Sequence, residues 1–397
     1  MTPDSGSNKA LSISARLTRG NGKGIIIIMV KVTQFPAFAT LILTLGGLSV
    51  LPQWSPAAEV SRAVWGSTPD GREVSIWTLT NKHETRVKVA AYGGLLVSVE
   101  TADRTGKPGN ITLSYKSLDE ALAGGVFGSV IGRFANRISD GGFTLDGRRH
   151  DLLSFNEKTR VHIHGGTQGF HRQLWTGTAG KDESGSFITL TLTSLHGDEG
   201  YPGRVDVAVT YRLGDDNVLR LDYRGSTDKA THLNLTNHAY FNLAGSGDIL
   251  SHQLTMTCAG VLEVDGYKVP TGKIISVEGG PFDFLAGKTV GEDITEVTDG
   301  GYDHCFVISE NDKLTPFATL VDPTSGRTMA IATTKPGVQV FTANHFKDNP
   351  FPRHGGICFE TQFYPDTPNK PEFPSSVLRP GEEYCHTTEF RFGALPE

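Results

Sequence analysis

The sequence predicts an all-β fold, a large antiparallel β-sandwich, from its composition and its hydrophobic periodicity. The chain of 397 residues contains 47 Gly and 20 Pro, which suits many short strands joined by tight turns better than long helices. Apolar residues make up 38% of the chain, enough for the core of a large domain. Between residues 188 and 224, apolar and polar side chains alternate repeatedly.

Three stretches carry this strand pattern. In 188–193 Ile and Leu alternate with Thr, in 205–212 Val and Tyr alternate mostly with polar residues, and in 219–224 Leu and Tyr alternate with Arg and Asp. Alternation of this kind is typical of strands with one buried face. We therefore expect an antiparallel meander across these residues.

Two local signals predict a turn and a helix. Asp146-Gly147, between FTL and RRHDLL, is typical of a two-residue hairpin turn. Ser117 and Glu120 have the spacing of a helix capping box, which predicts one short helix near residues 117–122.

The first 58 residues are expected to lie outside the fold. Lys31 precedes an apolar run at 38–51 and a small-residue stretch at 55–58, the order found in secretory signals. We interpret 1–58 as an upstream extension and signal peptide, with the true start at Met29. Residues 59–397 show no linker or repeat and are predicted to form one domain.

A membrane anchor is the alternative interpretation of the apolar run. The run is shorter than the roughly 20 residues that a helix needs to span a bilayer. We therefore expect a cleaved signal and a periplasmic or secreted protein without a stable membrane anchor.

Charge and cysteine content exclude some classes of function. Without residues 1–58 the chain keeps 32 basic and 42 acidic residues, a balance that disfavours nucleic acid as a partner. The four cysteines (Cys258, Cys305, Cys358 and Cys385) have no CxxC spacing, so free and partly buried thiols are expected.

Histidines in unusual surroundings are the first candidates for chemistry. They occur in HIHGG (162–166), NHAYFNLAG (237–245) and GYDH (301–304). On a strand, His162 and His164 would share a face and converge on one pocket, as would His238 and Tyr240. Structural histidines and a zinc site are the alternatives, although HxH without HExxH or a cysteine cluster is a weak metal signal.

The second signal is a carboxylate within an apolar run. Glu360 lies in GGICFETQFYP, on the same predicted strand face as Cys358 and Gln362. Without an adjacent Lys or Arg, such a glutamate is either part of a structural ion pair or a base with a raised pKa. Asp303 is a second candidate carboxylate.

Polar donors stand in IGRFANRI (131–138). Asn136 and Arg137, together with Arg133, offer hydrogen-bond donors for hydroxyl groups, although an arginine near carboxylates also forms structural pairs.

The ordered segments IGRFANRI, HIHGG, DEGYPG, NHAYFNLAG, GYDH, PGVQVFTANH and ETQFYPDTPNKPEFPSSVLRPGEEY resemble the aldose 1-epimerase (galactose mutarotase) family, from about Val60 to the C-terminus. The resemblance implies the galactose mutarotase-like supersandwich and the interconversion of the α and β anomers of free aldoses such as galactose or glucose. It implies no metal and no other cofactor.

The resemblance also assigns roles to individual residues. His238 matches the general acid, Glu360 the general base and His164 a second histidine beside the sugar ring. The positions that match sugar-hydroxyl contacts are Asn136, Arg137, Tyr240, Asp303 and Gln339. Cys305 stands where relatives often have asparagine, which bears on the choice of aldose.

Two other classes of function remain open at this stage. A glycoside hydrolase would use a pair of carboxylates, for which Asp303 and Glu360 are the candidates, but it would leave the histidines without a role. A non-catalytic exported carbohydrate-binding protein would use the same hydroxyl contacts without turnover. A sugar-phosphate epimerase would need a cluster of Arg or Lys, which the motif regions lack.

Overall fold

The computed structural model describes residues 13–18, 25–30, 59–309, 313–347 and 351–396, and the chain divides into two units, Met1–Trp54 and Ser55–Glu397. In the first unit β1 (Ile13–Thr18) pairs antiparallel with β2 (Ile25–Val30). The apolar run of the expected signal lies outside the described residues. None of the described helices is long and apolar enough to cross a membrane.

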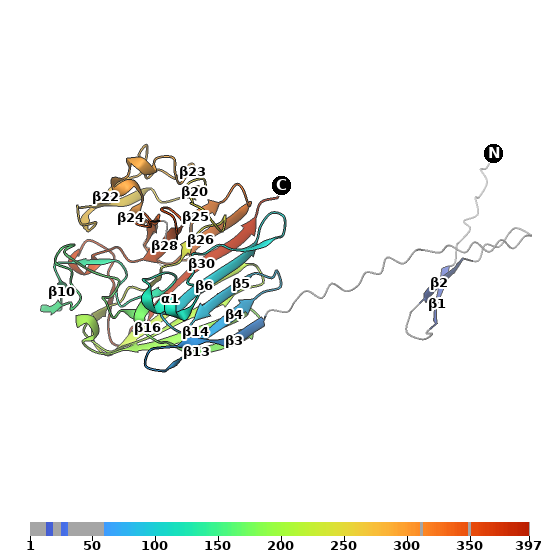
Figure 1. The fold of residues 1–397 in the computed structure, drawn as a ribbon, viewed down its shortest axis with the longest axis horizontal. Helices are drawn as coiled ribbons and strands as arrows, with labels where there is room; N and C mark the ends of the chain where they lie inside the picture. Colours follow the sequence, from blue (N-terminus) through green and yellow to red (C-terminus); the bar gives the residue numbers. More distant parts are fainter. Residues whose placement is uncertain (1–12, 19–24, 31–58, 310–312, 348–350, 397) are drawn as a thin grey trace, which may run out of the picture. The chain divides into compact units, whose positions relative to one another are not determined.

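The second unit is built from three large antiparallel sheets (Figure 1). The five-stranded sheet contains, in spatial order, β3 (Glu59–Ser67), β4 (Glu73–Thr80), β5 (Arg86–Ala90), β6 (Leu95–Ala102) and β7 (Pro108–Asn110). The nine-stranded sheet contains β13 (Thr176–Asp182), β14 (Gly185–Ser194), β15 (Val205–Leu213), β16 (Val218–Thr227), β30 (Tyr384–Ala394), β26 (Arg327–Thr333), β25 (Thr315–Val321), β20 (Gln253–Met256) and β23 (Lys288–Thr289). The six-stranded sheet contains β19 (Tyr240–Phe241), β28 (Ile357–Gln362), β27 (Gly337–Phe341), β24 (Asp303–Val307), β21 (Gly260–Val264) and β22 (Pro270–Ser276).

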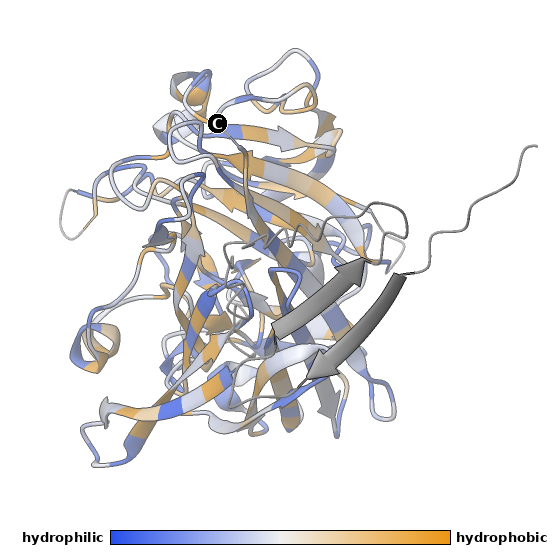
Figure 2. Cartoon of the chain, turned by 90° about the vertical axis from the view of Figure 1, so that its right-hand side faces the viewer, coloured by the Kyte–Doolittle hydropathy of each residue, from blue (hydrophilic) through white to orange (hydrophobic). Residues whose placement is uncertain are grey.

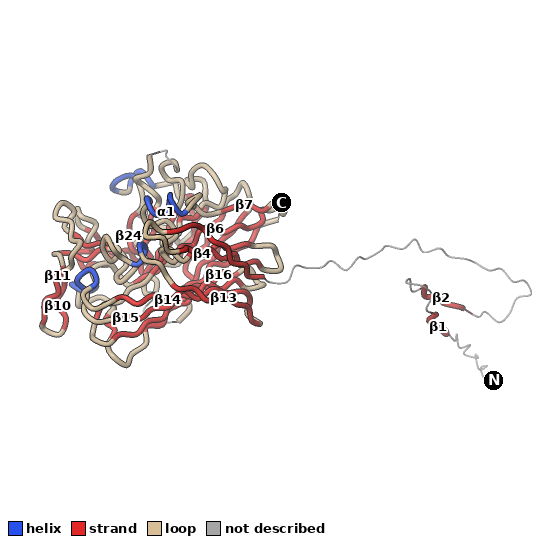
Figure 3. The backbone as a smooth tube through the Cα atoms, turned by 60° about the horizontal axis from the view of Figure 1, so that its bottom comes forward, coloured by secondary structure: helices blue, strands red, loops and turns tan. Residues whose placement is uncertain are grey.

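Short strand pairs and few helices complete this unit (Figure 3). The pairs are β8 (Val130–Ile131) with β18 (Thr236–Asn237), β9 (Arg137–Ser139) with β12 (Val161–Ile163), β10 (Gly142–Leu145) with β11 (Arg148–Asp151), and β17 (Thr231–His232) with β29 (Val377–Leu378). The α-helix assigned within the described residues is α1 (Leu118–Ala123), and the other helical segments are single 3₁₀ turns.

One continuous core joins the three sheets. In β15 the side chains of Val205, Val207 and Val209 are buried and alternate with half-buried ones, so the strands are banded by hydropathy in Figure 2. These valines share a core with Val89 of the five-stranded sheet and Val340 of the six-stranded sheet. The predicted antiparallel β-sandwich is therefore confirmed, because period-two side chains bury one face of each sheet against another.

Both local predictions are confirmed. Asp146 and Gly147 connect β10 to β11 in a hairpin. At the start of α1 the Ser117 hydroxyl accepts a hydrogen bond from the Glu120 N–H at 3.3 Å, and the Glu120 carboxylate accepts one from the Lys116 N–H at 2.8 Å. The reach of Glu120 to Lys116, one residue before the cap, is a variant of the capping box.

The six-stranded sheet presents polar side chains on the face opposite the core. Val338 and Val340 of β27 and Phe359 of β28 belong to the core, whereas Gln339 and Glu360 alternate with them and oppose each other across the strand pair. Because successive side chains of a strand point to opposite faces, the core residues fix the direction of the polar ones. This polar face holds the candidate site.

Candidate active site

A buried imidazole and a buried carboxyl group meet at the centre of the site. The Nε2 atom of His238 lies 3.5 Å from Oε1 of Glu360, and the two residues are 4% and 2% exposed. Glu360 is fixed by β28, and the backbone of His238 is held by bonds to Gly128 and Ser129 beside β8. The second oxygen of Glu360, Oε2, is buried without a hydrogen-bond partner among the described residues. A buried acceptor of this kind is suited to a ligand hydroxyl.

Burial shifts the pKa values of Glu360 and His238 in opposite directions. It raises the pKa of Glu360 to about 8, with the Asp303 charge acting in the same direction. It lowers the pKa of His238 to about 4. Near neutral pH the pair therefore holds one proton, which lies on Glu360 when the site is empty. Groups with shifted pKa values in contact are typical of proton-transfer sites.

A second carboxylate, that of Asp303, accepts hydrogen bonds from two side chains. Arg137 Nη2 donates to Asp303 Oδ2 at 3.0 Å, and Gln339 Nε2 donates to Asp303 Oδ1 at 2.6 Å. Burial alone would raise the pKa of Asp303, but the Arg137 charge and the Gln339 hydrogen bond outweigh it and hold this pKa below its ordinary value. Asp303 is therefore an anion that can accept further hydrogen bonds, not a proton donor.

His164 is oriented by the backbone of Asn136. The Asn136 N–H donates to His164 Nδ1 at 3.2 Å, and the His164 N–H donates to the Asn136 carbonyl at 3.0 Å. Burial, followed by the charges of His238 and Arg137, lowers the pKa of His164 well below its ordinary value, so the ring is neutral. With Nδ1 accepting, Nε2 carries the proton and becomes a hydrogen-bond donor.

The chain turn after His164 requires glycine. Gly165 has φ of +77°, and a Cβ atom there would lie 1.9 Å from the carbonyl oxygen of Gly132. This close approach explains a glycine in HIHGG and brings the His164 ring to 5.2 Å from the His238 ring.

Aromatic rings form the wall behind His238. The Tyr240 ring stacks on it with centroids 5.1 Å apart. Tyr240 is in turn packed edge-on by Phe127 and contacts Phe346. The wall excludes water from one side of the pair, which is why burial dominates both pKa shifts.

The structure brings together every residue that the motifs place in the site, and corrects two other expectations. His162 does not converge with His164, because β12 ends at Ile163 and His164 adopts φ of +54°; His162 is buried against Tyr201 instead. Arg133 donates four hydrogen bonds, to the Ser194 hydroxyl and to backbone carbonyls, so most of its donors are already used.

Two cysteines near the pair have contacts that sequence reasoning missed. The Sγ atom of Cys358 lies 3.4 Å from His238 Nδ1, on the side of the ring that faces away from Glu360. Cys305 opposes Gln339 across the β24–β27 pair. The strand pattern predicted that Cys358 and Glu360 share a face, but it did not show that His238 lies beside Cys358. Cys258, Cys305 and Cys358 are buried and Cys385 is exposed.

The same histidines and glutamate are also compatible with a metal ion. One possible ligand atom from each of His164, His238 and Glu360 lies within 4.8 Å of the other two. The HxH pair of the alternative zinc interpretation is not part of this group, because His162 lies outside it. Two imidazoles and a carboxylate are ligands that Zn²⁺ accepts, so the role of metal needs a direct test.

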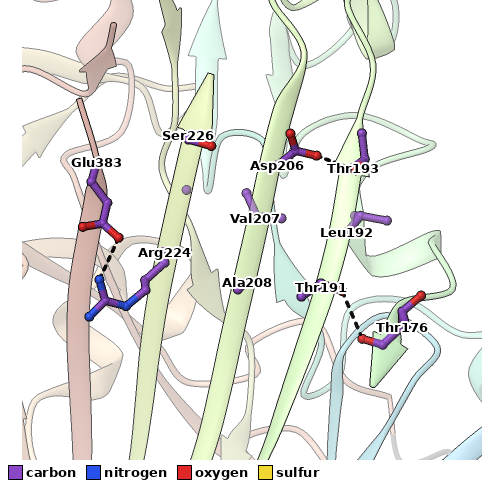
Figure 4. Close-up of a pocket in the computed structure, with 11 residues that line it drawn as sticks. Thr176, Thr191, Leu192, Thr193, Asp206, Val207, Ala208, Arg224, Ser226 and Glu383 are labelled. Carbon is purple, nitrogen blue, oxygen red and sulfur yellow. Dashed lines mark hydrogen bonds and ion pairs between the residues drawn. The ribbon is translucent and has the colours of Figure 1, made fainter. Parts of the chain in front are cut away.

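A separate hollow lies on the outer face of the nine-stranded sheet (Figure 4). Its volume is about 490 Å³. Its charged residues are solvent-exposed and already paired, with Arg224 bonded to Glu383 at 2.7 Å and Asp206 to Thr193 at 2.5 Å. Exposed pairs of this kind are ordinary surface interactions. The candidate site is therefore the polar face of the six-stranded sheet.

Fold and site together define an enzyme that moves protons on a small polyhydroxylated substrate. Comparison with known proteins specifies the class. Residues 75–391 match the family model described as aldose 1-epimerase. The chain is 38% identical over 344 residues to galactose mutarotase of Bos taurus, covering 84% of this chain and 98% of the bovine protein. It is 32% identical over 350 residues to aldose 1-epimerase of Escherichia coli K12, covering 82% and 96%.

Solved structures agree with these sequence relatives. Galactose 1-epimerase from Lactobacillus acidophilus NCFM superposes with a TM-score of 0.76 at 26% identity, covering 85% of this chain and 99% of that one. An aldose epimerase homologue from C. elegans gives 0.74 at 27% identity, covering 85% and 100%. The chain belongs to the aldose 1-epimerase family.

Proposed function

We propose that this enzyme interconverts the α and β anomers of free aldoses, galactose and glucose among them, with Glu360 as general base and His238 as general acid. The observation that carries the proposal is the buried contact of 3.5 Å between His238 Nε2 and Glu360 Oε1. The ring oxygen and the O1 hydroxyl of a sugar are bonded to the same carbon. Two groups this close can therefore serve both oxygens at once.

Each turnover moves two protons. The reaction starts with the pair's proton on His238. Glu360 takes the proton from O1 while His238 gives its proton to the ring oxygen. The bond between C1 and the ring oxygen breaks, and an open aldehyde forms. After rotation about the C1–C2 bond, the hydroxyl attacks the other face of the carbonyl. Both proton transfers then reverse, which returns the pair to its starting state. General acid and base catalysts each contribute about 10²- to 10⁴-fold.

The surrounding polar groups are suited to hold the sugar. Asp303 offers an anionic acceptor, whereas Arg137 and Gln339 keep spare donors beside it. His164 offers a neutral N–H donor, with Asn136 at its back. Tyr240 supplies the aromatic wall. Fixing the ring in this way aligns C1 with the acid and the base.

The alternative functions fit these contacts less well. A glycoside hydrolase would use Asp303 and Glu360 as its two carboxyl groups. It would leave the contact of 3.5 Å between His238 and Glu360 without a role. A binding protein without turnover has no use for a buried acid–base pair whose burial is costly.

Export to the periplasm or beyond the cell stays a proposal that rests on residues 1–58, and the mass of the mature protein tests it.

Polarimetry distinguishes the three functions. Freshly dissolved α-galactose should approach its equilibrium rotation faster with the enzyme than without it. A hydrolase would act on glycosides only, and a binding protein would change neither rate. An unchanged decay of rotation with folded protein would contradict the proposal.

The pH dependence of kcat/KM should be bell-shaped, with limbs near pH 4 and pH 8, because burial sets the pKa of His238 to about 4 and that of Glu360 to about 8. Between these values the pair holds the single proton that the active form needs. Below the lower limb a second proton binds, and above the upper limb the proton is lost. Glu360→Gln should remove the acidic limb and leave an alkaline limb, because the His238 general acid still loses its proton as the pH rises. An activity that kept rising above the upper limb would contradict this assignment.

Turnover should survive exhaustive treatment with EDTA, because the two protons can be moved by His238 and Glu360 without a Lewis acid. The measurement is the polarimetric rate before and after chelation, with metal analysis of the treated protein. If EDTA abolished activity and Zn²⁺ restored it, the group of His164, His238 and Glu360 would be metal ligands.

A further inference from the structure

Strand β28 contacts both nitrogens of the His238 ring. Cys358 and Glu360 are two residues apart on one face of this strand, so their Cα atoms are roughly 6.7 Å apart. The ring lies between them, with Nδ1 3.4 Å from the Cys358 sulfur and Nε2 3.5 Å from Oε1 of Glu360. The proposed acid–base chemistry uses the second contact and gives the first no role.

The Nδ1 nitrogen of His238 needs a hydrogen-bond acceptor throughout turnover. His238 begins the reaction as an imidazolium, which carries protons on both ring nitrogens. After Nε2 has given its proton to the ring oxygen of the sugar, the neutral imidazole keeps the proton on Nδ1. A buried N–H without an acceptor would cost free energy in both states. The acceptor on that side therefore decides whether Nε2 is the nitrogen that exchanges protons.

The sulfur of Cys358 is placed to be this acceptor. Cys358 is fully buried, in an apolar cluster with Tyr240 and Ala343. Burial, followed by the charge of Glu360, raises the pKa of its thiol well above the ordinary value, so the group is uncharged. The His238 ring also forms a hydrogen bond with the backbone carbonyl of its own residue, which only Nδ1 can reach. This bond indicates a proton on Nδ1, the nitrogen beside the sulfur.

An uncharged acceptor suits an acid that must give its proton away. A carboxylate beside Nδ1 would stabilise the imidazolium and make it a weaker acid. Sulfur is a weak acceptor without charge, so it orients the ring and preserves the low pKa of His238, about 4, which burial causes.

We propose that Cys358 is a positioning residue for catalysis, whose sulfur accepts a hydrogen bond from the Nδ1–H of His238 and so makes Nε2 the nitrogen that exchanges its proton. The inference rests on the proposed function, because Nε2 is the atom that serves the ring oxygen of the sugar. Nδ1 keeps its proton through the whole cycle, so no further bond is made or broken. In the empty enzyme Nε2 carries no proton and faces the protonated carboxyl group of Glu360.

The kinetic test replaces the sulfur in three ways. Cys358→Val removes the acceptor and should lower kcat about threefold to tenfold, the range for losing one hydrogen bond, and should change KM less than about twofold. Cys358→Ala removes the sulfur without adding volume and should match Cys358→Val. Cys358→Ser keeps an acceptor and should stay within about twofold of the wild-type kcat.

A matched control lies in the main core. Cys258 is a free thiol that is 3% exposed, and it belongs to a different hydrophobic cluster from Cys358. Cys258→Val should therefore leave kcat unchanged. Equal losses in Cys358→Val and Cys358→Ser, or in Cys358→Val and Cys258→Val, would mean that packing and not the acceptor is responsible, and would overturn the proposal.

A spectroscopic measurement reads the position of the proton without turnover. In ¹⁵N-labelled wild-type enzyme without sugar, the ring signals of His238, assigned by their loss in His238→Asn, should show a protonated Nδ1 and an unprotonated Nε2. Cys358→Val should reduce the share of this tautomer, and Cys358→Ser should restore it. A wild-type ring with its proton on Nε2 would overturn the proposal, because Cys358 would then donate its S–H to Nδ1. Folded wild-type enzyme that shows the expected tautomer but does not accelerate mutarotation would instead contradict the proposed function, and leave Cys358 without a catalytic role.

Discussion

Glu360→Gln should lower kcat for mutarotation by at least about 100-fold, the low end for the loss of one general catalyst. Glutamine keeps the size and hydrogen bonding of the side chain in β28 but cannot take the O1 proton. KM should change little, because sugar binding depends on Asp303, Arg137 and Gln339. Polarimetric kcat and KM are the measurements, with circular dichroism as the control for folding.

His238→Asn should have an effect of similar size, because asparagine cannot supply a proton near neutral pH. The two residues act in one transition state, so the double variant should be little worse than the poorer single variant. Effects that multiplied in the double variant would mean that the residues act in separate steps. A folded Glu360→Gln enzyme with more than about a tenth of wild-type kcat would exclude general-base catalysis by Glu360, since tenfold is only about 1.4 kcal/mol of barrier.

The strands and the two reacting groups could be predicted because they depend on local patterns. Period-two alternation predicted β14, β15 and β16, since each buries one face against the shared core. Glu360 was visible as a carboxylate within an apolar strand, where burial must shift its pKa. The structure adds His238, whose Nε2 lies 3.5 Å from Oε1 of Glu360, so that the two groups can exchange protons with one substrate.

Features that depend on the path of the chain between strands could not be predicted. His162 and His164 separate because the backbone leaves the extended region at His164, which an HxH pattern does not reveal. Arg133 donates hydrogen bonds to carbonyl oxygens of residues that follow it by more than 60 positions in the sequence.

Breaking the ion pair between Arg137 and Asp303 should have the second large effect, and it should lower stability as well as activity. The two side chains are 16% and 13% exposed. Arg137→Met should therefore lower the free energy of unfolding by about 3 kcal/mol, the low end for breaking a buried pair, because Asp303 is left as an uncompensated buried charge. Without Arg137, burial should raise the pKa of Asp303, so the loss should be largest at neutral pH and should shrink in acid, where the carboxyl group is protonated.

Asp303→Asn distinguishes the two roles of this pair. It removes the anionic acceptor for sugar hydroxyls, so KM should rise and kcat should fall as the ring loses its alignment with the acid and the base. Combining it with Arg137→Met removes both charges, so urea unfolding should show most of the lost stability restored while the activity stays low. A double variant as unstable as Arg137→Met alone would mean that the buried charge is not the cause of the loss. An unchanged KM in folded Asp303→Asn would mean that Asp303 does not hold the sugar, because a hydrogen bond to a charged group is worth about 1.5 to 3 kcal/mol, at least a tenfold change in affinity.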